Sequence, residues 1–286
     1  MTEENITSDF IEDINSQLGD FNSVKSEFTD LRECYVSNSG YTRLLKARRF
    51  GKTYMLKCLK KDYLFTPMYR MALSKEFEIG LQMEHTNICR TIGFEELDHL
   101  GPVIILEYID GDTLESFISK GLLTKTLARK FFVQIKEVLQ YIHNKQTIHR
   151  DLKPSNIMVT HNGQNIKLID FSLSDNDTFN VFKAPGGTSG YIAPELFLPN
   201  AKSDIRCDIY SFGVLASYMA HTTNDKAMKQ VAQKCMNHNP ALRPHDMTAI
   251  MLPPDANASQ IAALVILSLT AVCLIAYIIV RLTQVF

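Results

Sequence analysis

The stretch TIHRDLKPSNIMVT, residues 147–160, places a His, an Arg, an Asp, a Lys and an Asn within eight consecutive positions. Apolar residues flank this polar cluster, with Ile148 before it and 157–159 after it. A second apolar run, NIKLIDFS (165–172), follows and ends in the acid Asp170. Carboxylate and amide oxygens are ligands that Mg²⁺ takes together with substrate phosphates. The pattern predicts a phosphate and metal site between two strands; the alternative is a solvated turn.

The composition is that of a globular protein. The chain has 286 residues, of which 45% are hydrophobic and 21% charged, enough for one large domain or two lobes. Its formal net charge of −1 gives no overall basic field, so we expect no nucleic-acid partner. The six cysteines form no CxxC pair, which favours a reducing compartment over a disulfide frame or a zinc site.

The two ends of the chain differ from its middle. Acidic residues dominate the start, and we expect 1–32 to form an acidic, loosely ordered arm without a signal peptide. Near the other end, 261–280 carries no charge, and twenty residues give roughly 30 Å of helix. We expect a linker at 253–260, a transmembrane helix at 261–280 and a short tail at 281–286. A buried core helix is the alternative for 261–280.

Between these ends the pattern changes from strands to helices. Short runs rich in β-branched and aromatic residues occupy much of 33–108 and predict strands. One stretch there, MYRMALSKEFEIGLQME (68–84), has apolar residues at helical spacing. From 109 to 252 the pattern is helical. The sequence therefore predicts an α+β fold with a small strand-rich lobe followed by a helical lobe.

Four motifs, in order, resemble those of eukaryotic-type serine/threonine protein kinases. HRDLKPSN (149–156) matches the catalytic loop of that family, and DFS (170–172) stands where the family has DFG. GGTSGYIAPE (186–195) is similar to the end of the activation segment. DIYSFGV (208–214) is similar to the start of the long buried helix. The resemblance covers roughly 34–251.

The resemblance implies a bilobal kinase domain at 33–252, with an N-lobe at 33–108 and a C-lobe at 109–252. Only 35 positions separate Asp208 from Arg243, where the family usually has further helices. We therefore expect a shortened C-lobe that lacks the helix that often docks substrates and partners.

The resemblance also implies ATP and Mg²⁺ as cofactors, and it gives roles to the polar cluster. Asp151 would orient the attacking hydroxyl and accept its proton, and Lys153 would stabilise charge on the transferred phosphoryl group. Asn156 and Asp170 would hold two Mg²⁺ ions. The cluster would then lie where the two lobes clamp ATP and metal.

By the same resemblance, Lys57 in YMLKCL would hold the α- and β-phosphates. Family spacing favours Glu76 as its partner, with Glu78 as the competitor. The two acids lie about 200° apart around a helix, so only one can face the lysine. The adenine edge would be read by the hinge, which comprises the gatekeeper Leu106 and the backbones of Glu107 and Ile109.

The glycine-rich lid of the family is largely missing. Aligning Tyr41 with the aromatic residue of the lid leaves Ser37, Ser39 and Thr42 where glycines normally stand, and only Gly40 remains. Glycines allow backbone N–H groups to approach phosphates. We expect these residues to form a stiffer lid that contacts the nucleotide less closely.

Two further features concern the substrate. Lys153 and Thr188 together favour Ser/Thr acceptors over tyrosine, by the resemblance. Arg243 in NPALRP would pair with Glu195 of the APE motif, as in the family. The partner expected is therefore a protein with a Ser or Thr acceptor, and the sequence does not indicate an oligomeric state.

Three functions are compatible with these features. The first is a single-pass membrane kinase that transfers the γ-phosphoryl group of ATP to protein hydroxyls, with its kinase domain in the cytoplasm, where ATP is. The second is a membrane-anchored pseudokinase that binds nucleotide or acts as a scaffold. A small-molecule kinase is the third, which the peptide-positioning segment GTSGYIAPE disfavours. A pseudokinase usually loses the equivalent of Lys57, Asp151 or Asp170, and this chain keeps all three.

Overall fold

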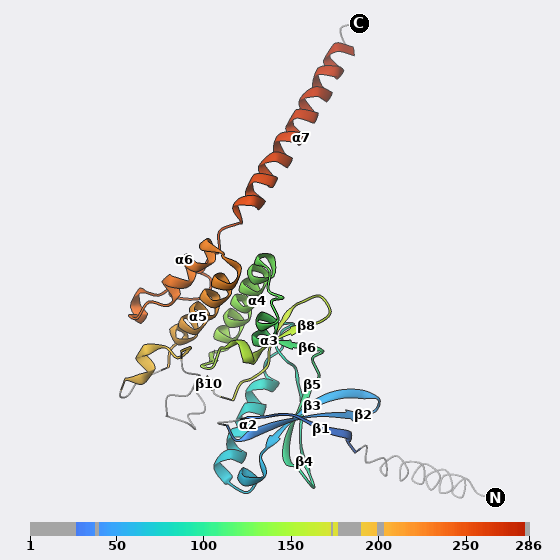
Figure 1. Cartoon of the computed structure of the whole chain (residues 1–286), viewed down its shortest axis with the longest axis vertical. Coiled ribbons are helices and arrows are strands. Elements are labelled where there is room, and N and C mark those ends of the chain that lie inside the picture. Colours follow the sequence, from blue (N-terminus) through green and yellow to red (C-terminus); the bar gives the residue numbers. More distant parts are fainter. Residues whose placement is uncertain (1–26, 38–39, 173, 177–189, 199–202, 284–286) are drawn as a thin grey trace, which may run out of the picture.

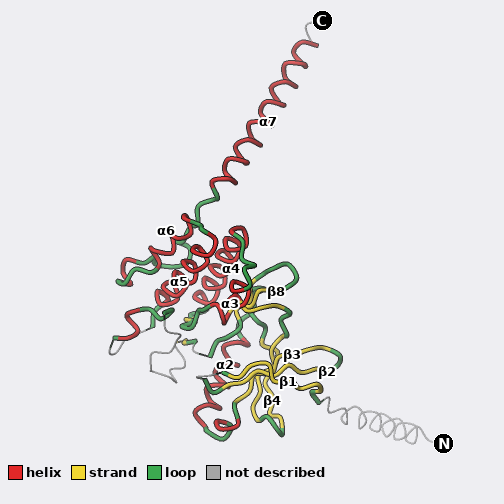
Figure 2. Tube along the Cα trace, in the orientation of Figure 1, coloured by secondary structure: helices red, strands yellow, loops and turns green. Residues whose placement is uncertain are grey.

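The computed structural model describes residues 27–37, 40–172, 174–176, 190–198 and 203–283. Strands gather in one lobe and helices in the other, with the long C-terminal helix leaving the helical lobe on the side away from the strands (Figures 1 and 2). The predicted α+β, two-lobe architecture is confirmed for these residues.

The strand-rich lobe is built on a five-stranded antiparallel sheet with the order β1-β2-β3-β5-β4. Its strands are β1 (Thr29–Val36), β2 (Thr42–Arg49), β3 (Lys52–Leu59), β4 (Thr91–Leu97) and β5 (Gly101–Glu107). Phe50 and Gly51 join β2 to β3, and both have positive φ, of 50° and 72°. Two central residues with positive φ are typical of the type I′ hairpin turn, whose twist matches that of the strands.

Alternation along the strands sorts their side chains onto the two faces of the sheet. Leu45, Leu56 and Cys58 are buried on one face, where Val103 and Ile105 of β5 complete a small core. Lys57, between two of these residues, points to the opposite face, where α2 (Pro67–Leu81) packs. One face of the sheet therefore makes the lobe stable, and the other carries functional groups.

The helical lobe has one large core, centred on α4 and α5. Its helices are α3 (Leu114–Ser119), α4 (Lys125–Asn144), α5 (Ile205–Thr223) and α6 (Lys226–Cys235). Short strands complete it: β6 (Gly111–Thr113), β7 (Thr147–Ile148), β8 (Ile157–Thr160), β9 (Ile166–Leu168) and β10 (Asp175–Asn176). Four 3₁₀ turns add to the two lobes: η1 (Lys61–Tyr63), η2 (Pro154–Asn156), η3 (Pro194–Phe197) and η4 (Pro240–Leu242). Phe132 of α4 meets Phe212 of α5 with ring centroids 4.8 Å apart.

The lobe is short after α5. Between the end of α5 and Arg243 the chain forms α6 and the single turn η4, and then reaches the arginine. This agrees with the shortened C-lobe predicted from the spacing of Asp208 and Arg243.

Two predicted boundaries differ from the structure. β1 begins at Thr29, inside the range 1–32 assigned to the acidic arm, because Phe28 packs on Tyr54 and under Arg49 and so brings the chain onto the sheet early. The last helix, α7 (Ala256–Thr283), begins inside the predicted linker 253–260. Proline is tolerated just before or within a first helical turn, so Pro254 does not delay its start.

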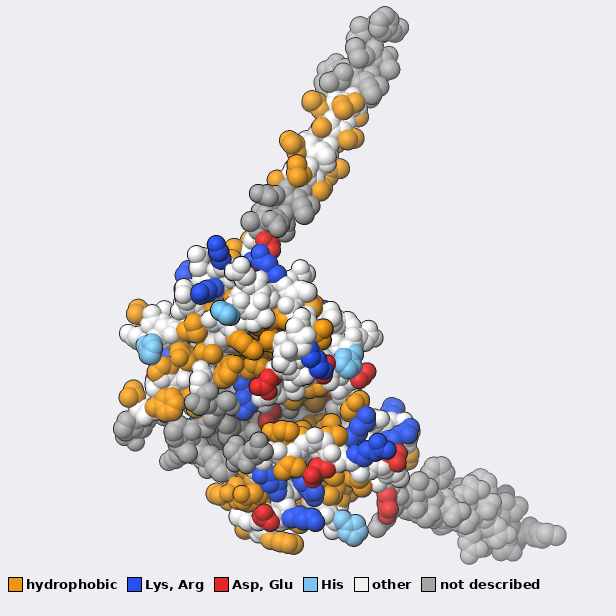
Figure 3. Space-filling model, in the orientation of Figure 1, with side chains coloured by type: hydrophobic (Ala, Val, Ile, Leu, Met, Phe, Trp, Pro, Cys, Tyr) orange, Lys and Arg blue, Asp and Glu red, His pale blue; other side chains and the backbone are white. Residues whose placement is uncertain are grey.

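The described side chains of α7, at 263–276, are exposed. Its large apolar residues, from Leu264 to Ile275, are each 50–67% exposed, and Figure 3 shows them along the helix as it projects from the lobe. Among the residues that the structure describes, no helix has the combined length and apolarity needed to cross a membrane.

Candidate active site

A buried acid at the start of α5, Asp208, binds the backbone of the catalytic loop. The backbone N–H groups of His149 and Arg150 each donate to the Asp208 carboxylate at 2.8 Å, and His143 Nε2 lies 2.9 Å from it. Burial alone would raise the pKa of Asp208, but His143, His149 and the N–H donors hold it below its ordinary value. Arg150 has a φ of 67°, and its bond to Asp208 helps hold this strained backbone in place.

The sequence analysis did not assign a role to Asp208. A signal was nevertheless present, because Asp208 lies in the first turn of an otherwise largely apolar helix. Buried carboxylates require bound partners, and those partners lie 58 to 65 positions earlier in the chain.

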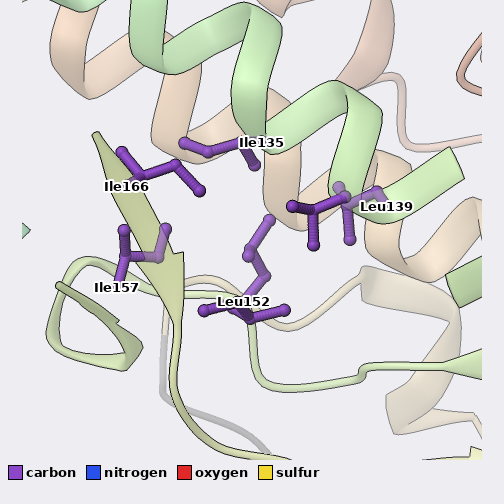
Figure 4. Close-up of a pocket in the computed structure, with 7 residues that line it drawn as sticks. Ile135, Leu139, Leu152, Ile157 and Ile166 are labelled. Atoms are coloured by element: carbon purple, nitrogen blue, oxygen red, sulfur yellow. The ribbon is translucent and has the colours of Figure 1, made fainter. Parts of the chain in front are cut away.

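A buried leucine, Leu152, also holds the same loop through apolar contacts. Leu152, between Asp151 and Lys153, is fully buried. In Figure 4 it lies among side chains of α4 and of the strands β8 and β9, in a pocket lined by Ile135, Val138, Leu139, Leu152, Ile157, Ile166 and Leu168. The space between these side chains is too small for a water molecule. This pocket is therefore packed core that positions the loop.

Asp151 is fixed by the residues that follow it. Asn156 Nδ2 donates at 2.9 Å both to the backbone oxygen of Asp151 and to its Oδ2. Lys153 Nζ lies 2.7 Å from the same Oδ2. The structure thus brings these three predicted site residues together in one polar cluster.

Asp170 is brought beside this cluster by the antiparallel pairing of β8 and β9. The strands pair from Ile157↔Leu168 onward, and Ile169 N donates to Asn156 O at 3.1 Å, so the start of β8 lies beside the end of β9. Lys57 Nζ and Ser172 N both donate to Oδ1 of Asp170, at 2.8 and 2.9 Å. Both side-chain bonds of Asn156 use its Nδ2. Asn156 Oδ1 and Asp170 Oδ2 are the oxygens that these bonds do not use, and they are the candidate metal ligands.

These two oxygens suit Mg²⁺, which takes few protein ligands and completes its shell with phosphates and water. In the described part of the chain, no three or more His, Cys, Asp or Glu side chains come together as a metal site. An ion here would thus rely on Asn156, Asp170 and the nucleotide.

Lys57 links the strand-rich lobe to this cluster. Its Nζ lies 2.5 Å from Glu76 Oε1 of α2 and 2.8 Å from Asp170 Oδ1. Glu78, the alternative partner considered from the sequence, is exposed on the other side of α2. α2 is therefore seated against the sheet, with Lys57 bridging the two acids.

Glu76 and Asp170 both bind Lys57, but their pKa values shift in opposite directions. Burial raises the pKa of Glu76 to about 7, against the opposing effect of Lys57. Burial would also raise the pKa of Asp170, but Lys57 and the Ser172 N–H bring it well below its ordinary value. Burial would lower the pKa of Lys57, but Asp170 and Glu76 raise it. Asp170 therefore stays ionised, as a metal ligand must.

The hinge follows β5. Glu107 N donates to Arg90 O at 3.0 Å, and Glu107 O accepts a weak bond from Cys89 Sγ at 3.8 Å. A carbonyl has two lone pairs, so the backbone group that Glu107 can offer to a ligand is its carbonyl. Its side chain accepts from Lys167 Nζ at 2.5 Å and from Arg90 N at 2.9 Å. Leu106 packs against the buried side chains of Leu59, Leu73 and Ile104. Ile109, two residues beyond Glu107, is half-buried.

The lid residues are only partly described. Ser37 Oγ accepts from Gly40 N at 2.8 Å, and Ser37 N donates to Thr42 O at 3.2 Å, so the loop is closed by its own groups. Ser39 lies outside the described residues, as does Thr188 of the activation segment.

The APE glutamate and the late arginine, 48 positions apart, are in contact. Arg243 Nη1 and Nη2 lie 2.6 and 2.7 Å from the two carboxylate oxygens of Glu195. Arg243 also donates to Arg206 O at 2.9 Å and to Asn237 O at 2.7 Å. This buried fork ties the end of the activation segment to α5 and to the turn before η4.

The geometry agrees with what sequence comparison finds. The protein kinase domain family matches residues 38–269. The chain is a member of the protein kinase family. The match begins at the lid and includes the catalytic cluster, the hinge and the Glu195–Arg243 fork.

Individual kinases are similar over somewhat more than half of the chain. It is 32% identical over 178 residues to an Aurora kinase of Yarrowia lipolytica, a match that covers 62% of this chain and 47% of that protein. It is 35% identical over 168 residues to the probable serine/threonine-protein kinase MARK-A of Dictyostelium discoideum, covering 56% and 15%. It is 32% identical over 196 residues to mitogen-activated protein kinase kinase 7 of Arabidopsis thaliana, covering 65% and 62%. The chain thus spans less than two thirds of each of these relatives.

Proposed function

We propose that the protein is an ATP-dependent serine/threonine protein kinase. One observation carries the proposal: two polar groups lie side by side between the lobes, Asp151 with Asn156 and Lys57 with Glu76 and Asp170. The backbone bond from Ile169 N to Asn156 O, next to Asp170, joins them. Family membership and the serine/threonine-kinase relatives support it. Phosphoryl transfer depends mainly on positioning and charge neutralisation, which such a cluster supplies.

The roles follow from the contacts. Asp151, held by Asn156 and beside Lys153, orients the acceptor hydroxyl and takes its proton. Lys57 releases its hold on Asp170 in part to bind the α- and β-phosphates, while Glu76 keeps the lysine in place. Asn156 and Asp170 would hold Mg²⁺, which would supply neutralisation of phosphate charge. Lys153 stabilises charge on the transferred group, and the carbonyl of Glu107 and the backbone of Ile109 read adenine.

The test is phosphate transfer from labelled ATP to a generic Ser/Thr substrate by the full chain, compared with Asp151→Asn. We expect the variant to lose at least about 100-fold in rate, because general-base catalysis contributes about 10²–10⁴. ATP affinity and thermal stability should change little, since the residue keeps its shape. Equal rates for the two proteins would show that Asp151 is not the base. ATP binding without transfer by the wild type would favour a nucleotide-binding pseudokinase.

We also propose that residues 261–280 anchor the protein in a membrane with a single pass, the kinase domain being cytoplasmic. The proposal rests on the twenty uncharged residues of the sequence and on the exposure of every large apolar side chain described from Leu264 to Ile275. Apolar side chains on all sides of a helix suit hydrocarbon better than an interfacial position, which requires a polar face. The cytoplasmic orientation follows from the need for ATP.

A further inference from the structure

Tyr41 immediately precedes β2, and its ring contacts α2. It stacks on Tyr69 of α2 with centroids 4.9 Å apart, and Tyr69 in turn meets Tyr63 of η1 at 4.7 Å. The backbone of Tyr41 is fixed as well, because Lys60 N donates to Tyr41 O at 2.9 Å. Tyr41 is therefore held at both its backbone and its ring.

The end of α2 that Tyr41 contacts begins with Pro67 and is bonded through Arg70 to Leu64 O and Glu96, but it lacks capping groups. Thr66, which precedes the helix, makes no side-chain capping bond, and the first turn contains no acid to complement the helix dipole. Packing supplies the rest of its support. Tyr69 belongs to a stripe with Leu73 and Phe77 that packs on Leu59 and Ile104 of the sheet.

The same stripe leads to the catalytic pair. Tyr69 and Glu76 are seven residues apart, which is nearly two full turns, so they lie on the same side of α2. Tyr41 stacks on Tyr69, and Lys57 Nζ lies 2.5 Å from Glu76 Oε1. Burial raises the pKa of Tyr41, and the charge of Glu76 adds to this effect.

We infer that Tyr41 is a positioning residue, whose stack on Tyr69 ties the start of β2 to the first turns of α2 and so keeps Glu76 against Lys57. In this chain the serine-rich lid satisfies its own Gly40 N–H through Ser37, and the aromatic contact links the lid strand to α2. Its effect on ATP use rests on the kinase activity proposed above; its effect on α2 does not.

The first measurement is amide hydrogen exchange over residues 67–81 in full-length protein without nucleotide. Tyr41→Leu should speed exchange in the first turns of α2 by about threefold to tenfold, since aromatic pairs contribute on that scale. Tyr41→Phe keeps the stack and should behave as wild type. The matched control is Tyr35→Leu, on the neighbouring strand β1, where the tyrosine is 57% exposed. Unchanged α2 exchange in Tyr41→Leu would overturn the inference.

The second measurement is a double-mutant cycle of Tyr41→Leu and Tyr69→Leu, scored by the KM for ATP. Each single variant should raise KM by about threefold to tenfold, and the double variant should be no worse than the poorer single one. Fully additive effects would contradict a shared contact. If the wild type transfers no phosphate, the proposed activity fails, while α2 exchange still decides the role of Tyr41.

Discussion

At the scale of single residues, the catalytic loop depends on the buried carboxylate of Asp208. Asp208 is completely buried and collects two backbone N–H groups and a histidine. Such a carboxylate stabilises the fold only while it is ionised and paired. Its removal should therefore affect stability and loop geometry together.

Asp208→Asn should lower the free energy of unfolding at pH 7 by about 3 kcal/mol and strongly reduce phosphate transfer, because one acceptor oxygen becomes a donor in a buried site. Urea unfolding measures the first effect. The exposed Asp62, in η1, gives a matched control as Asp62→Asn. Wild-type stability in Asp208→Asn would contradict the role assigned to this acid.

The same pair of proteins should show a defined pH dependence. The pKa of Asp208 is lowered in the folded state, so its contribution is present above the unfolded value near pH 4 and is lost as pH falls through the folded value. The stability difference between wild type and Asp208→Asn should thus be constant from pH 6 to 7 and shrink below about pH 4. A difference that grew on acidification would have the wrong sign.

At the scale of elements, the lid of this kinase is closed by its own side chain. Ser37 Oγ occupies the N–H of Gly40, which a glycine-rich lid would leave for phosphate. The residue after Gly40, Tyr41, also joins the lid to α2 through its stack on Tyr69.

Ser37→Ala should release that N–H and lower the KM for ATP by about fivefold, the equivalent of about 1 kcal/mol for one hydrogen bond. Ser37→Gly should do the same or more. Steady-state kinetics at varied ATP measure the effect, and Ser119→Ala in α3 removes a comparable hydroxyl away from the lid. A higher KM in both Ser37 variants would mean that the closed loop itself favours the nucleotide.

A second element-scale contact joins α4 to the end of the shortened lobe. Arg129 binds Asp225, the residue that caps α6, at 2.5 and 3.0 Å, and donates to Pro253 O at 2.7 Å. One side chain thus fixes both α6 and the segment that leads to α7.

Arg129→Met should lower the free energy of unfolding by about 2 kcal/mol, because it leaves the buried Asp225 carboxylate without its cation. Chemical denaturation of residues 1–255 or of the full chain measures this. Lys229→Met, at an exposed site on α6, should stay within about 0.5 kcal/mol of wild type. Equal losses in the two variants would show that the Arg129 pair has no special weight.

At the scale of the whole molecule, the chain combines a compact two-lobe kinase domain with an apolar helix that projects from the C-lobe (Figure 3). α7 leaves beside the segment held by Arg129, on the side of the C-lobe away from the strands (Figure 1). If the helix enters a bilayer, the nucleotide site therefore lies at a distance from the membrane surface, where a protein substrate can reach it.

Full-length protein should sediment with membranes at high speed and need detergent for release, and residues 1–255 should stay in the supernatant. A charge at the middle of a spanning helix costs about 2.5–3.5 kcal/mol, so Leu267→Arg should shift protein toward the supernatant. The control Leu242→Arg changes an exposed leucine of the C-lobe and should sediment as wild type does. Full-length protein in the supernatant without detergent would refute the anchor. Digestion of the kinase domain by external protease in intact cells would refute the orientation.

Residue order along the chain is enough to predict the two-lobe arrangement, the family and the residues that can carry the chemistry. These features are written in local patterns: strand alternation in β2 and β3, helical spacing in α2, and the ordered polar groups of 149–156. The short C-lobe could also be predicted, because the number of residues between Asp208 and Arg243 limits how many helices can form there. The start of β1 was placed too late, since the packing of Phe28 on Tyr54 is a contact between residues far apart in sequence.

Which of these groups come into contact depends on how the elements pack, and residue order does not predict it. The contact of Lys57 with Glu76 and Asp170 spans 19 and 113 positions, and the anchoring of the loop by Asp208 spans about 60. No sequence motif predicts the stack of Tyr41 on Tyr69 or the bond between Ser37 Oγ and Gly40 N. The physical reason is that hydrogen bonds, ion pairs and ring contacts depend on distances of a few ångströms. Such distances are set by how sheet, α2 and α5 pack together, whereas a motif records only order along the chain.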